Sequence, residues 1–361
     1  MTVFTDEFYQ ISASEAFKKS RCMEHEHNIS QLFASMLLNL GYQRIDNHTW
    51  RHWAQHKKTV IVCLVDDFTT CRTDYSQPIT KCFDPNTVII TDNRMLVDTQ
   101  YSVLTLPHSY IGTFSYPPDP VGFAPDKRFS FSVHRLDHQR ALILLELVAQ
   151  SGGVNNWLQL DHVNFNCYDP DGHNNTSSDL QHNFITMCND ISVHFPEYLA
   201  LATQLTELMP IRTHNWSIER AHVSAYLTLV LETYSGDNVI TFSEKTTRAL
   251  LTPAPWALFG CFGAVDWLAN LGFDVLADIV DHDYNKVRQE PSYRGIEKIR
   301  AYITSCVKIY QNLASMDQNK LRTRCEQAAR HNYQRLAELQ HQWPGDFANW
   351  LPMAIDKIAG K

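Results

Sequence analysis

A carboxylate beside an ammonium follows an apolar, β-branched run in the second half of the chain. Residues 239–242 (VITF) predict a buried strand, which breaks into the polar tetrapeptide SEKT at 243–246. An amphipathic segment and a second apolar run at 256–259 follow, so the stretch predicts the strand–helix–strand unit of a parallel sheet. Such sheets bind ligands where strands end and helices begin. There Glu244 can accept bonds from ribose hydroxyls, while Lys245 and the helix amino end bind phosphate oxygens.

Neighbouring side chains extend this candidate ligand set. Ser243 and Thr246 offer hydroxyls and backbone N–H groups to the same phosphates. Glu232 follows the apolar run 222–231, which predicts another strand, so it also stands at a strand end. Arg248 is an alternative phosphate cation if the loop turns differently. The competing interpretation of the acid–amine pair is a surface ion pair at a helix start, which contributes under about 1 kcal/mol.

Two arginines flank a second predicted helix start. Residues 129–133 predict a strand and residues 137–149 an amphipathic helix, for which Asp137 is a suitable N-cap. A guanidinium can hold a diphosphate through two parallel hydrogen bonds and offset the negative charge that grows on it as it leaves. We therefore expect at least one of Arg135 and Arg140 to bind phosphate, with Arg135 favoured because it lies in the turn, and a pair of exposed helix charges is the alternative.

These segments resemble the nucleotide-sugar half of GT-B glycosyltransferases, in particular the fucosyltransferase-like enzymes and the glycosyltransferases of phage genomes. The resemblance covers residues 127–310 and depends on the motifs LET at 231–233, FSEKT at 242–246, FG at 259–260 and LGF at 271–273. In that family a Glu-Lys pair grips the ribose and diphosphate of the donor, and the resemblance transfers this role to Glu244 and Lys245. The block 129–140 resembles the strand-to-helix turn that supplies phosphate-binding arginines.

The resemblance implies an α/β protein of the GT-B type, in which two Rossmann-like domains face each other across a cleft. We expect an N-terminal acceptor-side domain at 1–115, a nucleotide-sugar-binding domain at 127–315, and helices at 316–361 that pack back toward the first domain. Five prolines between 107 and 125 interrupt regular structure and support the boundary. A loop that covers the cleft is the alternative for this proline-rich segment.

Hydrophobic periodicity predicts further elements. Continuous apolar runs at 59–65 and 87–91 are typical of buried parallel strands. Helical spacing predicts helices at 31–40, 195–208, 294–312 and 317–341. A stretch rich in Asn, Asp, Gly and Ser predicts a loop at 164–179.

Two carboxylates end the clearest strand of the first domain. Asp66 and Asp67 follow the run 59–65. An inverting sugar transfer needs a base that takes the proton of the acceptor hydroxyl as it attacks the anomeric carbon. Asp66 or Asp67 is our candidate for this base, and Asp92 and His108 are rivals. The alternative is a turn or helix-cap residue, which is the commoner use of Asp at strand ends.

Two Asp-x-Asp triplets imitate the metal-binding motif of GT-A transferases. Asp281 and Asp283 could hold Mg²⁺ or Mn²⁺ against a diphosphate, and Asp169 and Asp171 form a second match. The first lies after the predicted donor unit and the second in an Asn-rich loop, so we expect no metal site. No tightly bound cofactor is expected either, and the donor substrate is a nucleoside diphosphate sugar, with a UDP-sugar favoured.

The resemblance implies a glycosyltransferase that moves one sugar from this donor to an acceptor hydroxyl. The phage-type likeness suggests DNA modification, in which glucose or arabinose is added to 5-hydroxymethylcytosine in double-stranded phage DNA. Transfer to a surface polysaccharide or a protein is one alternative. A non-catalytic nucleotide-binding module is the other.

Composition bounds these possibilities. The 361 residues are 44% hydrophobic and 19% charged, which is typical of a globular chain, and the net charge of −8 argues against a surface that attracts nucleic acid everywhere. Three basic clusters offer either a local groove or solvated helix faces: Lys57-Lys58, Arg294-Lys298-Arg300-Lys308 and Arg322-Arg324-Arg330. Nine Cys without a Cys-x-x-Cys pair indicate a cytoplasmic protein, and the lack of a long apolar run indicates that no helix spans a membrane. We expect the host cytoplasm if the protein is phage-encoded, and a monomer or weak dimer.

Overall fold

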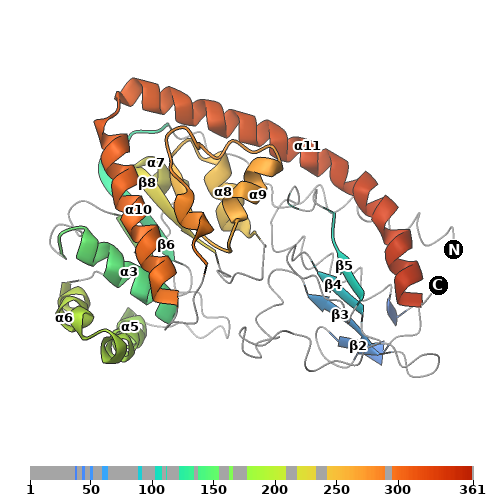
Figure 1. Cartoon of the computed structure of the whole chain (residues 1–361), viewed down its shortest axis with the longest axis horizontal. Coiled ribbons are helices and arrows are strands. Elements are labelled where there is room, and N and C mark those ends of the chain that lie inside the picture. The colour runs from blue at the N-terminus through green and yellow to red at the C-terminus, as the bar shows by residue number, and fades with distance from the viewer. Residues whose placement is uncertain are drawn as a thin grey trace. The chain divides into compact units, whose positions relative to one another are not determined.

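The computed structural model contains two compact units. One comprises residues 1–117, 238–247 and 333–361, and the other residues 118–237 and 248–332 (Figure 1). Helices and strands occur in both, so the predicted α/β class is confirmed, whereas the GT-B arrangement stays a prediction. The structure describes residues 37–38, 43–44, 49–51, 59–63, 88–91, 102–107, 111, 122–133, 137–153, 162–165, 177–208, 218–232, 242–288 and 295–359.

The first unit contains a mixed five-stranded sheet in the order β1-β2-β3-β4-β5. The strands β3, β4 and β5 run parallel, whereas β1 and β2 form antiparallel pairs with their neighbours. The predicted strands at 59–65 and 87–91 are confirmed as β3 and β4, and of the predicted helix at 31–40 only Leu37 and Leu38 are described, both helical. The strands are Gln43–Arg44 (β1), Thr49–Arg51 (β2), Thr59–Cys63 (β3), Val88–Thr91 (β4) and Ser102–Thr105 (β5).

The second unit contains a four-stranded sheet in which every pair is parallel. Its order is β7-β6-β8-β9, so the first strand in sequence, β6, lies between the second and the third. Parallel strands are covered on both faces, which explains why β8 is buried along nearly its whole length. The strands are Lys127–Val133 (β6), His162–Phe165 (β7), Ala225–Leu231 (β8) and Trp256–Phe259 (β9).

Helices connect these strands. On one sheet face α10 packs through aromatic rings, since Phe129 lies 5.4 Å from Tyr310 and Phe259 lies 5.2 Å from Tyr302, measured between ring centroids. The described helices are α3 (His138–Gln150), α5 (Ser177–His194), η4 (Pro196–Tyr198), α6 (Leu199–Leu208), α7 (Ile218–Val223), α8 (Glu244–Leu251), α9 (Ala264–Asn270), η5 (Asp283–Lys286), α10 (Ile296–Ser315) and α11 (Gln318–Ala359).

Several predicted bounds are wrong. The predicted strand at 222–231 starts only at Ala225, because residues 222 and 223 complete α7. Phe242 lies outside any strand, and residues 239–241 fall outside the described residues. The predicted loop at 164–179 begins within β7 and ends within α5. The remaining helix predictions agree with η4 and α6, with α10, and with the first part of α11.

The last helix is longer than predicted and contains two prolines. The sequence pattern ended it at 341, yet α11 continues through Pro344 and Pro352. Buried side chains recur at helical spacing across both prolines, and this apolar stripe outweighs the lost hydrogen bonds. They include Trp343, Phe347, Trp350, Leu351 and Ala354.

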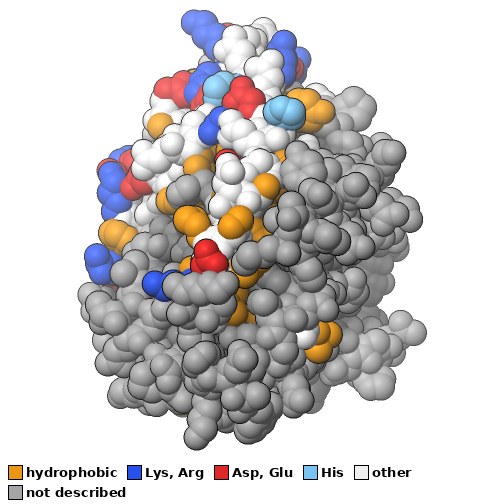
Figure 2. Space-filling model, turned by 90° about the vertical axis from the view of Figure 1, so that its right-hand side faces the viewer, with side chains coloured by type: hydrophobic (Ala, Val, Ile, Leu, Met, Phe, Trp, Pro, Cys, Tyr) orange, Lys and Arg blue, Asp and Glu red, His pale blue; other side chains and the backbone are white. Residues whose placement is uncertain are grey.

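On the face shown in Figure 2, the described Lys and Arg side chains are interspersed with Asp and Glu.

A tyrosine hydroxyl accepts from the outer edge of β9, the last strand of the described four-stranded sheet. The Leu258 amide donates to Tyr284 Oη at 2.9 Å, and His282 Nδ1 lies 2.8 Å from the same oxygen. His282 Nε2 lies 2.7 Å from the Val275 carbonyl, which only accepts, so Nε2 carries the proton and Nδ1 accepts from Tyr284. Burial lowers the pKa of His282 and keeps it neutral, as this arrangement requires. Such caps block unwanted strand pairing at sheet edges.

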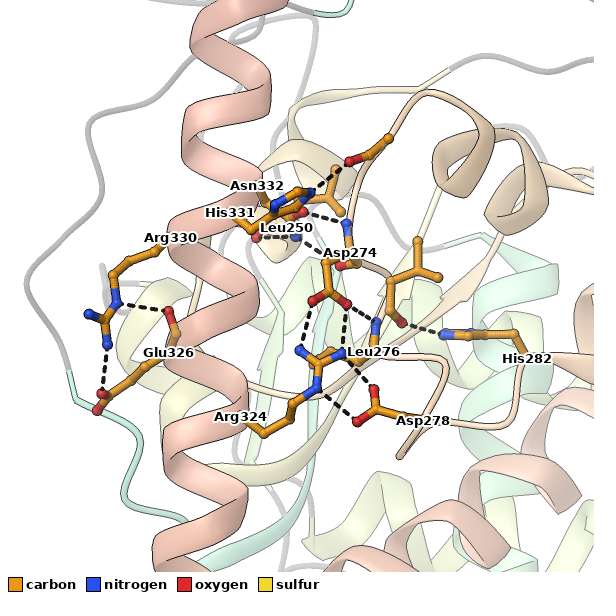
Figure 3. A network of polar contacts seen from close by, with 12 residues as sticks. Leu250, Asp274, Leu276, Asp278, His282, Arg324, Glu326, Arg330, His331 and Asn332 are labelled. Carbon is orange, nitrogen blue, oxygen red and sulfur yellow. Dashed lines mark hydrogen bonds and ion pairs between the residues drawn. The ribbon is translucent and has the colours of Figure 1, made fainter.

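A charged network attaches the start of α11 to the loop after α9 (Figure 3). Arg324 donates from Nη1 and Nη2 to both oxygens of Asp274, at 2.7 and 2.8 Å, and from Nε to Asp278 at 2.8 Å. Burial alone would raise the pKa of Asp274, but the bonds from Arg324 and Leu276 lower it, and Arg324 likewise lowers the pKa of Asp278. Asn332 donates to the carbonyls of Leu250 and Asp274.

We expect Arg324→Met to lower the free energy of unfolding by about 1–3 kcal/mol, because it removes charge-assisted bonds and leaves two carboxylates adjacent. Urea denaturation at pH 7 measures this loss. Arg330→Met is the control: Arg330 is 73% exposed on the same helix and contacts only Glu326 among the ion pairs described, so its loss should stay under about 0.5 kcal/mol.

The difference in the free energy of unfolding between wild type and Arg324→Met should depend on pH. Asp274 and Asp278 have lowered pKa values in the folded protein, so their stabilisation is present above the unfolded value of about 3.9 and is lost as the pH falls through the folded values. The gap between wild type and Arg324→Met should therefore narrow below about pH 4. If Arg324→Met and Arg330→Met lost the same free energy of unfolding, or if the difference between wild type and Arg324→Met did not change with pH, this role of the network would be contradicted.

Candidate functional site

The order of the second sheet creates one position suited to a ligand. The neighbours β6 and β8 lead to strands on opposite sides, β6 to β7 and β8 to β9. In open parallel sheets the crevice for a ligand lies outside the carboxyl ends of the strands at such a switch point. These ends are Val133 and Leu231, and we call this end of the sheet, together with the side chains around it, the carboxyl edge.

Glu232 lies on this edge directly after β8. Its amide donates to the Phe259 carbonyl at 3.0 Å, which continues the ladder between β8 and β9, and only 7% of the residue is exposed. Gly260 leaves room beside it, because a Cβ at that position would lie 3.8 Å from Glu232 Cγ. Glu232 also makes interactions within the protein, and its position at the end of a strand next to the switch point is what makes it a candidate for ligand binding.

Arg140 is the third residue of α3 and is 6% exposed. The predicted N-cap is confirmed: Asp137 Oδ1 accepts from the Arg140 amide at 2.9 Å, and its Oδ2 lies 3.4 Å from Arg140 Nη1. The guanidinium is therefore buried beside Asp137 at the start of α3 and is not a solvated helix charge. Arg135 lies outside the described residues.

Lys298 is a buried cation that the sequence analysis assigned only to a basic cluster. It is the third residue of α10, is 4% exposed, and its Nζ lies 5.7 Å from the Phe259 ring centroid at the end of β9. The cluster itself is divided, since Arg300 pairs with Glu197 at 3.2 Å and Lys308 is exposed. Its helical spacing to the buried Tyr302, four residues on, is the signal from which burial could have been predicted.

The helices that carry Arg140 and Lys298 begin at the same edge. Arg300 Nε lies 3.8 Å from Glu146 Oε2, and one turn later Thr304 donates to Gln150 at 3.2 Å. Because both contacts advance by four residues in each helix, α3 and α10 run in the same direction. The two helices lie side by side in Figure 1, as these contacts require. Two helix amino ends therefore face the carboxyl edge.

The predicted ligands around residue 244 lie at the start of α8. Ser243 Oγ accepts from the Lys245 amide at 3.3 Å and lies 3.5 Å from Lys245 Nζ, so it acts as a cap for the helix. Ser243 is 4% exposed, Thr246 is 1% exposed, and Lys245 is half-buried. Glu244 is the first residue of α8, and only its backbone belongs to the described part of the structure.

The alternative cation Arg248 also lies in α8. Burial and the positive charge of Arg248 lower the pKa of His222 to about 3, so this imidazole stays neutral. His222 is 5% exposed and its Nδ1 has no hydrogen-bond partner among the described residues. Arg248 is thus positioned beside a neutral histidine in the second unit.

The structure does not reach the predicted catalytic residues. Asp66, Asp67 and their rivals Asp92 and His108 lie outside the described residues, as does the Asp169-x-Asp171 triplet. Asp281 Oδ1 accepts from the Asp283 amide at 3.0 Å, and Asp283 pairs with Lys286 at 2.6 Å. The described side chains include no group of three or more His, Cys, Asp or Glu arranged to hold a metal ion.

Comparisons with protein-family models, with curated proteins and with solved structures found no match to this chain. A functional assignment therefore depends on the topology and on the side chains of the carboxyl edge. Within the described part of the chain, no helix has both the length and the apolar character needed to cross a bilayer.

Gly260 allows the edge to be altered without unfolding it. An added Cβ would meet Leu258 Cγ at 3.4 Å, an ordinary contact, so we expect Gly260→Ala to change the free energy of unfolding by less than about 1 kcal/mol. Gly263→Ala is the matched control in the same loop. Its φ of 73° strains any side chain, so it should cost about 1–2 kcal/mol in urea denaturation. The reverse ranking would show that Gly260 has no such room.

Proposed function

We propose that the protein is a glycosyltransferase of the GT-B type that transfers a sugar from a nucleoside diphosphate sugar, with UDP as the favoured nucleotide, to an acceptor hydroxyl. The observation that carries the proposal is the carboxyl edge, where a buried acid, Glu232, follows the central strand β8 and a buried cation, Arg140, begins the helix after β6. This combination suits a ribose and a diphosphate.

Each residue has a stated role in this proposal. Glu232 and Glu244 accept hydrogen bonds from ribose hydroxyls. Arg140 and Lys245, with Arg135, bind the diphosphate and offset the charge that grows on it as the bond to the sugar breaks. The amides and hydroxyls of residues 243 and 246 donate to the same oxygens. The charge is thus balanced by side chains, without a requirement for a metal ion.

The transfer itself needs a base. In the proposed reaction Asp66 or Asp67 takes the proton of the acceptor hydroxyl, its oxygen forms a bond to the anomeric carbon, and the bond from that carbon to the diphosphate oxygen breaks. The nucleoside diphosphate leaves with the electron pair of that bond. Residues 1–115 supply the acceptor side in this account, and residues 127–315 supply the donor side.

The acceptor follows from the phage-type resemblance: a hydroxymethylated cytosine in double-stranded DNA. The net charge of −8 requires any DNA contact to be local. Transfer to DNA should then weaken steeply between 50 and 200 mM salt, by about tenfold or more if several phosphates are contacted. Flat salt dependence together with activity on oligosaccharides would replace DNA by a glycan acceptor.

Calorimetric titration with UDP, GDP, CDP and dTDP tests donor binding. We expect one nucleotide to bind best, and we expect Lys245→Ala and Glu232→Gln each to weaken it about tenfold or more, because each removes a charge-assisted hydrogen bond. Lys320→Ala, an exposed lysine on α11, is the control and should leave affinity unchanged. Unchanged affinity in both test variants, with folding intact, would refute the assignment.

Donor hydrolysis separates the transferase from a non-catalytic nucleotide-binding module. A transferase without acceptor releases sugar slowly to water, so incubation with the matching nucleotide sugar should produce free sugar and nucleoside diphosphate. Tight nucleotide binding without any hydrolysis or transfer would favour the module. Gly260→Ala should lower donor affinity at unchanged stability, because its methyl group enters the space beside Glu232.

A further inference from the structure

A chain of hydrogen bonds joins the middle of β9 to the loop that follows α9. The Leu258 amide donates to Tyr284 Oη at 2.9 Å, the Tyr284 hydroxyl donates to His282 Nδ1 at 2.8 Å, and His282 Nε2 donates to the Val275 carbonyl at 2.7 Å. An amide can only donate and a carbonyl can only accept, so each proton in this chain has one possible position. We call these four groups the relay, and it is complete only while the imidazole is neutral.

Protonation of His282 is incompatible with the relay. It places a hydrogen on Nδ1, which can then no longer accept from Tyr284. If the tyrosine oxygen accepts from Nδ1 instead, its own hydrogen needs another acceptor. Tyr284 is only 4% exposed, and in the described part of the chain its hydroxyl has no third hydrogen-bond partner. A buried donor without an acceptor destabilises the folded state, and a buried positive charge destabilises it further.

The groups that face His282 leave it neutral. Its ring lies 5.5 Å from the uncharged ring of Trp256 in β9, measured between centroids. The carboxylates of Asp266 in α9 and Asp281 favour the protonated form, and so does the bond to Val275. Burial has the larger effect, so the pKa of His282 lies below its ordinary value. Its neutral form is therefore the one that packs against β9.

Two contacts join the segment after Tyr284 to the loop between β9 and α9. The Gly263 amide donates to the Asn285 carbonyl at 3.2 Å, and the guanidinium carbon of Arg288 lies 4.6 Å from the centroid of the Phe262 ring. This loop directly follows the end of β9, so it belongs to the carboxyl edge. The attachment of Tyr284 to β9 therefore also supports the loop at that edge.

We propose that His282 and Tyr284 form an acid-sensitive switch in the second unit. While His282 is neutral, the relay holds residues 282–288 on β9 and supports the loop 260–263. When His282 takes a proton from the solvent, the relay breaks and both segments are released. The switch goes beyond the proposed transferase activity and does not depend on which ligand the carboxyl edge binds, so it can be tested without any nucleotide.

Urea denaturation of the full chain at several pH values tests the switch. Because the folded pKa lies below the unfolded value of about 6.5, the stabilisation by neutral His282 is complete above that value and is lost as the pH falls from there toward the folded pKa. Between pH 7 and pH 5, the unfolding equilibrium constant of the wild type should rise about threefold or more relative to that of His282→Gln, whose amide does not titrate.

His331→Gln is the matched control. His331 is exposed, and its Nε2 likewise lies 2.8 Å from a carbonyl, that of Gly272. This variant should follow the wild type within about twofold over the same pH range, since exposed substitutions have small effects. The buried His222 is present in all three proteins, so its titration cancels in the comparison. Parallel pH dependence of His282→Gln and the wild type would overturn the proposal.

Hydrogen exchange of the wild type locates the release and covers the case in which His282→Gln does not fold. After correction for the intrinsic effect of pH on exchange, protection should fall about fivefold or more from pH 7 to pH 5 in peptides covering 256–263 and 282–288. Peptides covering β6 should keep their protection. Unchanged protection of the first two segments, or an equal loss in β6, would contradict the switch, because neither shows a local release.

Discussion

Removing a charged side chain from water costs a large amount of free energy, and the second unit buries such side chains mainly at one edge of one sheet. Glu232 follows the inner strand β8, while Arg140 and Lys298 lie in the first turns of α3 and α10, which pack against each other. The buried strands β8 and β9 and the buried length of α3 provide the stability that tolerates these charges. Sites that work against the stability of their own fold are commonly functional sites.

The remaining polar contacts of the second unit hold the surroundings of that edge in place. Arg324 fastens the loop at Asp274, and Asn332 joins that loop to the end of α8. Tyr284 closes the edge of β9, and Tyr302 donates to the carbonyl of Ala257 in the same strand. These contacts fix β9 and the loops around it, so the side chains at its carboxyl end have defined positions. Preorganisation of this kind reduces the entropy cost of binding.

The features predicted correctly from the sequence are those that depend on the local pattern of residues. The α/β class, the strand at 256–259 and the Asp137 cap of α3 all follow from apolar runs and a capping residue. It missed β7 and misplaced the start of β8, because short apolar runs do not distinguish a strand from the end of a helix. Lys298 was missed for another reason: its charge suggested solvent, and only tertiary packing against Phe259 buries it. The GT-B arrangement stays a prediction, since it concerns the two units together.

Hydrogen–deuterium exchange with and without saturating UDP-sugar tests most directly whether the carboxyl edge binds the donor. We expect slower amide exchange in peptides covering residues 137–141, 259–263 and 295–299, which line that edge, and no change in peptides covering β3 and β4. Unchanged exchange at all three segments, or protection confined to other parts of the chain, would contradict the account.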